Sequence, residues 1–494
     1  MTPQQFRPVG ALAGNPGAGG GAVAPGPART VRGRVARATQ AWPALYGYTL
    51  ALYVAVVLGR IHEAIPFVAR LYLGKTSALV LVAAAVMQVP GRDFARLFKT
   101  TTARCLMVIT GIGILSVPTS YWPSQSLGFF QNQWPQTLLL FGCVAVGVQY
   151  RRVAMACIIA LTATTGLAAL SFVLGGGADV NGRVFIGNAL SQTYDPNQSA
   201  ALFVTTLPYV VLLASRKGKL RWLAIPLIPL FVSALLKTDS RGGVVALGMV
   251  AVAFLGVATK KQRKAFLILF PLVAITLMLL PHSNLLARFS ELTAGTDYNF
   301  DARDGRWPIW KRGIGMMLSH PILGVGIGAY EAANATTANS WKAAHNAYIQ
   351  IGVELGIGGI LAFLLAIRSA LLSGWKVRSM SAPVGDESDD KLAFDRMLAT
   401  AALCSLIGEL TAAIFLSMAY DAMTLFALAV PTGLAMSLPV SKLKGRLAST
   451  GGGGARQPAQ RRPGWRSARR PAVQPAMQPA VVARSGRERR PPPR

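Results

Sequence analysis

The stretch RVAMACIIALTATTGLAALSFVL, residues 152–174, decides the fold class of this protein. After Arg152 it carries no charged side chain. A helix of about 20 apolar residues is long enough to cross the roughly 30 Å hydrocarbon core of a bilayer. Because similar runs recur between about residues 43 and 440, the sequence predicts an all-α polytopic membrane protein. A soluble enzyme and a protein with a single membrane anchor are both excluded.

The composition of the 494 residues agrees with this class. Charged residues make up only 14% and hydrophobic residues 52% of the chain, whereas a soluble domain carries about 25% charged residues. The net charge is +31, and the excess of lysine and arginine lies in both ends of the chain and in short segments beside apolar runs. This distribution is typical of orientation in a membrane, so we expect the lipid bilayer as a partner and no nucleic acid.

Apolar ranges predict about 12 transmembrane helices. They are 43–60, 76–90, 103–120, 135–150, 152–174, 198–215, 221–237, 242–258, 265–281, 347–373, 394–416 and 421–440. Basic residues gather in alternate loops, at 91–102, 151–152, 216–220 and 259–264, while loop 121–134 has no charge. By the positive-inside rule the basic loops face the cytoplasm. Residues 61–75 break this pattern and are predicted to be re-entrant or interfacial.

This topology divides the chain into five parts. Residues 1–42 and 441–494 are predicted to be disordered basic tails in the cytoplasm, because they are rich in Gly, Ala, Pro and Arg. Residues 43–281 hold spans one to nine, and residues 347–440 hold spans ten to twelve. Residues 282–346 form one long periplasmic loop containing amphipathic helices. The clearest of these is Arg306–Ser319, which we expect to lie in the membrane interface; a role as a mere anchor is the alternative.

The sequence indicates neither a metal nor a cofactor. The four cysteines form no C-x-x-C pair, and the four histidines lack the H-E-x-x-H spacing. The run GVGIGAY at 324–330 is not expected to bind a nucleotide, because no strand precedes it. Its glycines are instead expected to permit a tight turn or close backbone packing.

Polar side chains at the predicted outer face are the candidates for chemistry. His345 and Asn346 lie where the chain re-enters the membrane, and Glu354 follows in span ten. A carboxylate inside a membrane is costly unless it is paired, so Glu354 is a functional candidate. For a lone interfacial histidine, a structural role is the alternative.

Arginines at the same face suit phosphate groups, because guanidinium binds such oxygens in a bidentate manner. Arg241 lies in a very short outer loop, and Arg306 and Arg312 lie in the predicted amphipathic helix. Anchoring of helix ends is the alternative for these cations. Asn197 and Asp421 stand at the outer starts of spans six and twelve, where they could simply cap the helices. Together these residues point to an anionic, lipid-linked substrate handled outside.

Four motifs occur in a characteristic order: YDPNQSA at 194–200, TDSRGG at 238–243, the segment from RWPIWKRG to SHPILGVGIGAY at 306–330, and H-N-x9-G-x-x-G starting at His345. In these motifs, which cover about residues 190–365, the chain resembles the O-antigen ligase and O-antigen polymerase superfamily of bacterial envelope glycosyltransferases. The resemblance implies an enzyme of the bacterial inner membrane, with its active site facing the periplasm and both termini in the cytoplasm.

The resemblance also implies a reaction and roles for particular residues. The donor would be a glycan on undecaprenyl diphosphate, transferred with inversion and without a metal to a hydroxyl of lipid A core, a growing polysaccharide or a protein. Arg241 and Arg306 would bind the donor diphosphate, and His345 would act as general base or orient the acceptor. Asp421 resembles an acidic position of some ligases, and Arg303 and Arg312 are further candidates.

Several functions remain open at this point. A ligase of lipopolysaccharide biosynthesis is slightly favoured over a polysaccharide polymerase, and a protein O-oligosaccharyltransferase comes next. A flippase for lipid-linked glycans would bind the same donor without chemistry. Flippases tend to carry cations along a path within the helix bundle, whereas here intramembrane charges are few, with Glu409 the clearest. This distribution favours an enzyme.

Overall fold

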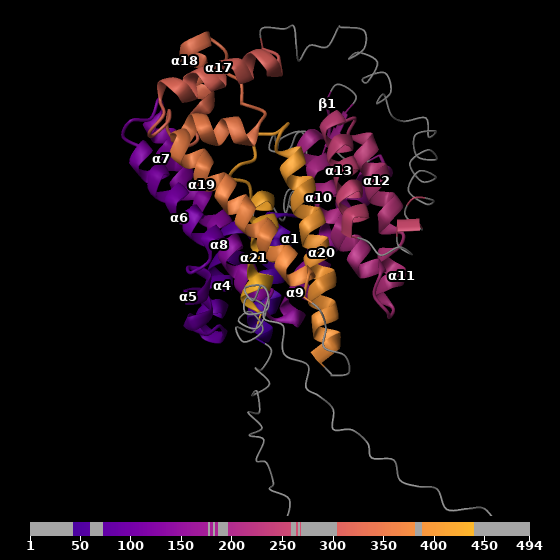
Figure 1. Cartoon of the computed structure of the whole chain (residues 1–494). Helices are drawn as coiled ribbons and strands as arrows, with labels where there is room; N and C mark the ends of the chain where they lie inside the picture. The colour runs from indigo at the N-terminus through magenta and orange to yellow at the C-terminus, as the bar shows by residue number, and fades with distance from the viewer. Residues whose placement is uncertain are drawn as a thin grey trace, which may run out of the picture. The chain divides into compact units, whose positions relative to one another are not determined.

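The computed structural model describes residues 43–59, 73–175, 178–180, 183–185, 196–257, 263–264, 267, 304–380 and 388–438. These all belong to one unit, Met1–Leu438. The helices and strands, shown in Figure 1, are α1 (Ala44–Val57), α4 (Leu73–Gln88), α5 (Gly91–Leu97), α6 (Thr101–Ser116), α7 (Pro123–Asn132), α8 (Trp134–Gly147), α9 (Arg151–Val173), β1 (Ala178–Val180), β2 (Arg183–Phe185), α10 (Pro196–Ala214), α11 (Leu220–Ala224), α12 (Leu227–Lys237), α13 (Arg241–Val257), α17 (Arg306–Ser319), α18 (Tyr330–Ala338), α19 (Ala347–Arg378), α20 (Ser388–Ala412) and α21 (Ala422–Met436).

The structure is mostly helical and contains several apolar helices, as expected for an α-helical membrane protein. Among the described residues, four helical stretches are long and apolar enough to cross a membrane: Arg151–Val173, Pro196–Ala214, Leu220–Lys237 and Ala347–Arg378. The pair α4 and α5, bent by 111°, makes a fifth if it is counted as one span. Inside a bilayer a helix pairs its own backbone groups, which explains why these apolar sequences become helices.

Most predicted spans coincide with a helix within a few residues. The predicted span at 265–281 lies almost wholly outside the described residues, as do the tails at 1–42 and 441–494 and most of the segment 61–75. Several helices in the predicted ranges, such as α1, α6, α13 and α21, are shorter than a full span.

Two local elements differ from the sequence-based expectation. The uncharged loop 121–134 contains the helix α7, which starts with proline in its first turn, a position where the missing N–H costs nothing. A short antiparallel pair of strands, β1 with β2, lies between α9 and α10 in the sequence, so the fold is not purely helical.

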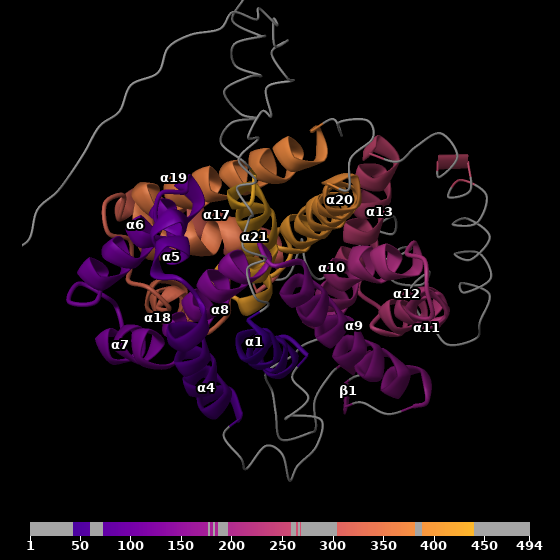
Figure 2. The ribbon, with the colours of Figure 1, turned by 90° about the horizontal axis from the view of Figure 1, so that it is seen from below.

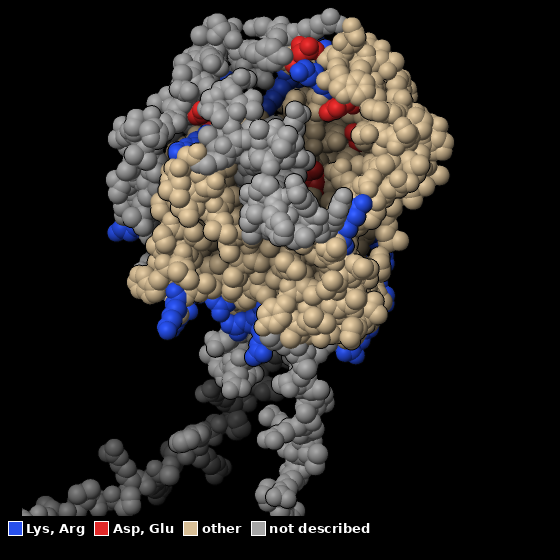
Figure 3. Space-filling view, turned by 180° about the vertical axis from the view of Figure 1, so that it is seen from behind, with Lys and Arg blue, Asp and Glu red and all other residues tan. Residues whose placement is uncertain are grey.

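Pairs of helices distant in sequence form the core. α19 packs along α6, and α21 packs against α8. Both α10 and α13 pack against α20. Figure 2 shows α4, α6 and α8 on one side and α10, α12 and α13 on the other, with α21 between them. On the face drawn in Figure 3, lysine and arginine side chains line the lower rim of the described surface, below a broad band with few charges. This arrangement agrees with the positive-inside pattern.

Candidate functional site

The connection between α20 and α21, residues 413–421, organises the candidate site. The backbone N–H of His345 donates to Ser417 Oγ over 2.8 Å, and that of Ala347 donates to the Ala413 carbonyl over 2.8 Å. The backbone of His345 has φ of 47°, a left-handed conformation that few non-glycine residues adopt. The connection therefore fixes the turn that carries the imidazole, which is half-buried.

Phe415 of the same connection lies between two other sequence-predicted parts of the site. The guanidinium carbon of Arg306, at the start of α17, lies 6.0 Å from the centre of the Phe415 ring. On another side, a Cβ placed on Gly242 would lie 3.1 Å from this ring. Gly242 follows Arg241, the first residue of α13, so one aromatic side chain joins the elements that begin with Arg241 and Arg306.

The motifs around Asn197 and Arg241 also meet. Asn197, in the first turn of α10, accepts a hydrogen bond from Ser240 Oγ over 2.8 Å at its Oδ1. Ser240 Oγ in turn accepts from the backbone N–H of Gly243 over 3.1 Å, which caps α13. A Cβ on Gly243 would lie 2.7 Å from Ala200, so only glycine permits this approach of α13 to α10. Asn197 is thus placed as a connector of the two motifs.

Two further residues stand at helix ends. Asp421 is the residue before α21, half-buried, and its backbone carbonyl accepts from the N–H of Leu425. Asn346 precedes α19, and its Oδ1 accepts from the N–H groups of Tyr348 and Ile349 over 2.9 and 3.0 Å. The structure therefore gives the Asn346 side chain the capping role that asparagine commonly has at this position.

The glycine motif 324–328 packs backbone to backbone against a break in α19. Gly356 interrupts the helix with φ of 66°, which frees the carbonyls of Val353 and Glu354 from their usual helical partners. Val325 N donates to the Val353 carbonyl over 2.9 Å, and Gly326 N to the Glu354 carbonyl over 3.1 Å. The expectation of close backbone packing by these glycines is confirmed.

Glu354 belongs to this same junction. Its side chain is fully buried, and its Oε2 accepts from the N–H of Gly328 over 3.0 Å. Gln350, one turn earlier, donates to Oε1 over 3.5 Å. These contacts place Glu354 as a brace between α19 and the glycine turn.

Arg312 lies in a network of polar side chains that connects distant parts of the predicted loop 282–346 with one another. Its Nε donates to Asn334 Oδ1 over 3.1 Å, and an amino nitrogen of its guanidinium lies 3.9 Å from Asp304. Asn334 donates to the Ser340 carbonyl over 2.8 Å, and Ser340 donates to Asp304. The contacts assign Arg312 to loop structure, while Arg303 lies outside the described residues.

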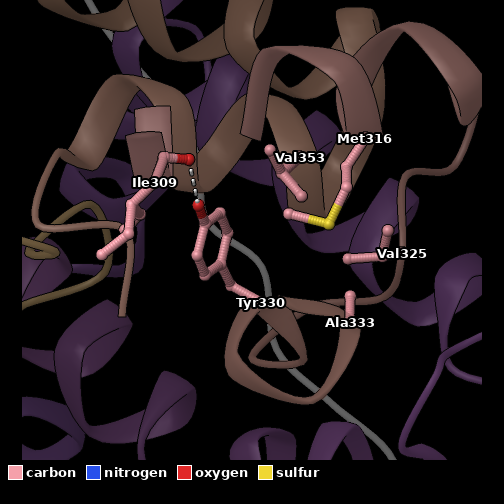
Figure 4. Packing of buried hydrophobic residues seen from close by; sticks show 7 residues of the cluster. Ile309, Met316, Val325, Tyr330, Ala333 and Val353 are labelled. Carbon is pink, nitrogen blue, oxygen red and sulfur yellow. Dashed lines mark hydrogen bonds between the residues drawn. The ribbon is translucent and has the colours of Figure 1, made fainter. Parts of the chain in front are cut away.

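A small hydrophobic core supports this region, as Figure 4 shows. Ile309 and Met316 of α17, Tyr330 of α18, Val325 and Val353 pack together. Tyr330 Oη donates to the Ile309 carbonyl over 3.2 Å. Burial raises the pKa of Tyr330, so its hydroxyl keeps its proton and this bond near neutral pH. The core joins α17, α18 and the start of α19 into one support.

Lys237 illustrates the alternative that was open for the outer cations. Its Nζ donates to the carbonyls of Phe172 and Val173 over 3.1 Å each, so it closes the end of α9. Arg241 and Arg306 are half-buried and lie on elements that touch Phe415. Within the described part of the chain, no three His, Cys, Asp or Glu side chains are grouped in a way that could hold a metal ion.

Sequence reasoning missed Phe415 and Ser417. Neither residue belongs to one of the four motifs. Phe415 falls at the end of the predicted span 394–416, and Ser417 follows directly after it. A contact signal between residues 345 and 417 would have been needed to find them.

The comparison with known families supports the resemblance. Residues 225–364 match the family model described as O-antigen ligase, a range that runs from α12 into α19 and contains Arg241, Arg306 and His345. No curated protein matches the chain. The match supports the O-antigen ligase superfamily for this chain and, broadly, a membrane enzyme of ligase or polymerase type that acts on a lipid-linked glycan and an acceptor.

Proposed function

We propose that this protein is an O-antigen ligase-like glycosyltransferase. It transfers a glycan from undecaprenyl diphosphate to a hydroxyl of lipid A core or a similar acceptor. The observation that carries the proposal is the connection 413–421, which contacts the elements of both His345 and Arg306 while the start of α13 packs on the same Phe415 ring. A base and two fixed cations are the groups that such a displacement requires.

The chemistry follows from these three side chains. The acceptor oxygen forms a bond to the anomeric carbon, the bond from that carbon to the diphosphate oxygen breaks, and the configuration inverts. His345 takes the proton of the acceptor hydroxyl, because an imidazole titrates near neutral pH. Arg241 and Arg306 stabilise the charge that develops on the departing diphosphate. The proposed reaction needs no metal and no nucleotide, because the donor already carries a good leaving group.

The proposal includes a place in the cell. We propose about twelve spans in the inner membrane, a periplasmic loop at 282–346, an active site at that face, and cytoplasmic tails at 1–42 and 441–494. The segments 43–281 and 347–440 would form the membrane part. The basic residues on the lower rim in Figure 3 support this orientation.

The polymerase is the second candidate, and one experiment separates the two. In a deletion strain, both surface glycan and glycan on undecaprenyl diphosphate are analysed. A ligase leaves long polymer on the carrier and none on the acceptor, whereas a polymerase leaves single repeat units. A protein O-oligosaccharyltransferase leaves unmodified protein, and unchanged surface glycans would contradict all three enzymes. If the protein in reconstituted vesicles translocates the lipid-linked glycan but does not transfer it to an acceptor, it is a flippase.

Complementation of the same strain tests the role of His345. We expect His345→Asn to reach the membrane in normal amounts but to restore no transfer, because asparagine tolerates the left-handed backbone and cannot act as base. The loss would be on the order of 100-fold or more, as for removal of a general base. The control Lys342→Gln, at an exposed position three residues earlier, should transfer normally. Normal transfer by His345→Asn would refute the mechanism.

A further inference from the structure

Glu409 is a buried acid that the proposed reaction does not use. It lies in the last turn of α20 and is 0% exposed. Among the described residues, no lysine or arginine is paired with it. Burial of an unpaired carboxylate is very costly, so such a group normally either gains a partner or becomes neutral.

Two threonines from different helices contact the carboxyl group. Thr205 of α10 donates to Glu409 Oε2 over 2.8 Å. Thr424 Oγ1 of α21 lies 2.8 Å from Glu409 Oε1 and also 2.8 Å from the backbone carbonyl of Met418. Both contacts of Thr424 have the length of a good hydrogen bond.

The number of protons decides how these contacts can be made. A threonine hydroxyl has one proton to donate, and a backbone carbonyl can only accept. If Thr424 donates to Met418, it cannot also donate to Glu409, so it must accept from Glu409 Oε1. Both contacts are then hydrogen bonds only when Oε1 carries a proton. The neutral acid also removes the cost of a buried charge.

The resulting chain of hydrogen bonds ends at the candidate site. It runs from Thr205 through Glu409 and Thr424 to the carbonyl of Met418. Met418 follows Ser417, which accepts from the backbone of His345. The Glu409 carbonyl also accepts from Ala413 N over 2.9 Å, at the start of the connection. The Glu409 side chain therefore ties the connection 413–421 to α10 and α21.

We infer that Glu409 is held as a neutral carboxylic acid and is a positioning residue, which fixes the connection 413–421 and through it the backbone of His345. Its effect on transfer rests on the proposed function. Its protonation and its bonds to Thr205 and Thr424 do not.

The substitution Glu409→Gln tests the protonation state. A glutamine amide offers one acceptor to Thr205 and one donor to Thr424, the same pattern as the neutral acid. We expect Glu409→Gln to leave the thermal midpoint of the purified protein unchanged and to keep its transfer rate within about twofold of wild type. Glu409→Leu removes both bonds, and we expect transfer to fall on the order of 100-fold, the cost of a small misplacement of a reacting group.

Thr424 supplies a second pair of variants in case Glu409→Leu does not accumulate. Thr424→Val should reduce transfer, and Thr424→Ser, which restores the hydroxyl, should recover it. Thr400→Val is the matched control, because Thr400 is half-buried on α20 and its hydroxyl donates to the Arg396 carbonyl of the same helix. The conservative replacements distinguish positioning by hydrogen bonds from loss of packing volume.

Infrared difference spectra give a readout that needs no substrate. The carbonyl stretch of a protonated carboxyl should be present in the wild-type protein and absent from Glu409→Gln. The inference would be overturned if Glu409→Gln reduced transfer as much as Glu409→Leu does. It would also be overturned if the wild-type protein lacked this infrared band. If the infrared and stability results hold while no variant or wild-type protein transfers glycan, the proposed function fails and the neutral acid stands.

Discussion

Single backbone conformations decide how the motifs of this protein come together. Among the described non-glycine residues, Asp239, Asn339 and His345 have positive φ, and two of the three lie in motifs that the sequence singled out. Gly356 has φ of 66° within α19, and a Cβ there would lie 2.4 Å from the Pro321 carbonyl. The N–H of Ile357 donates to that carbonyl over 2.9 Å. The first glycine of the H-N-x9-G-x-x-G pattern is thus required by a close backbone approach.

We expect Gly356→Ala to destabilise the protein strongly. With φ of 66° and ψ of −165°, Gly356 has a backbone conformation that costs other residues about 1–3 kcal/mol, and the contact with Pro321 requires the backbone to move as well. The thermal midpoint in detergent should fall, and glycan transfer should fall with it. Gly315→Ala is the control, because a Cβ at Gly315 in α17 meets nothing within 4 Å. An unchanged thermal midpoint for Gly356→Ala would show that the close backbone packing of α19 against the turn 324–328 contributes little to stability.

At the scale of an element, α17 shows how far periodicity can be used. The helix begins and ends at Arg306 and Ser319 as predicted. The large apolar side chains of this helix differ in their exposure. Trp307 and Leu318 are 52% and 66% exposed, whereas Trp310 donates from its ring nitrogen to the Ala344 carbonyl. The face that is buried comprises Ile309, Gly313 and Met316.

The exposed side of α17, which carries Trp307 and Leu318, is expected to lie in the interface at the periplasmic face of the inner membrane. A spin label at Leu318→Cys should be more accessible to oxygen than to a polar nickel reagent, because oxygen concentrates in lipid. The four native cysteines are buried and should not label. A label at the exposed position Glu331→Cys in α18 should show the lower oxygen preference of a polar site. Equal behaviour of the two labels in vesicles would contradict an interfacial α17.

At the scale of the whole molecule, topology connects the charge pattern to the site. Three of the predicted basic loops, 91–102, 151–152 and 216–220, lie at the end of the helices opposite α17 and α18 (Figure 1). Two arginines at that opposite end, Arg151 and Arg216, both stack on Phe394, with guanidinium carbons 4.8 and 5.1 Å from the ring centre. Partial burial and, to a smaller extent, the charge of Arg151 lower the pKa of Arg216. Both cations thus lie at the end that the sequence predicts to face the cytoplasm.

Reporter fusions test this topology directly. Green fluorescent protein fused after residue 440 should fluoresce, because it folds in the cytoplasm, and alkaline phosphatase fused there should be inactive. Alkaline phosphatase fused within 331–344 should be active, because that segment is predicted to face the periplasm. The opposite pattern at either position would show that the predicted orientation or the predicted number of spans is wrong.

The sequence alone predicts the fold class and most helix positions, and its motifs carry the resemblance to the O-antigen ligase superfamily. These depend on local properties: the length of apolar runs, the alternation of basic loops, and short motifs such as TDSRGG. The roles of individual polar residues became apparent only from contacts in the folded chain. Asn346 caps α19, Glu354 braces the glycine turn, Arg312 closes the loop network, and Phe415 with Ser417 joins the elements of the site. Apart from the local cap of Asn346, these roles are hydrogen bonds and ring contacts between residues far apart in the sequence, such as His345 with Ser417 and Arg306 with Phe415. Periodicity carries no information on such pairs.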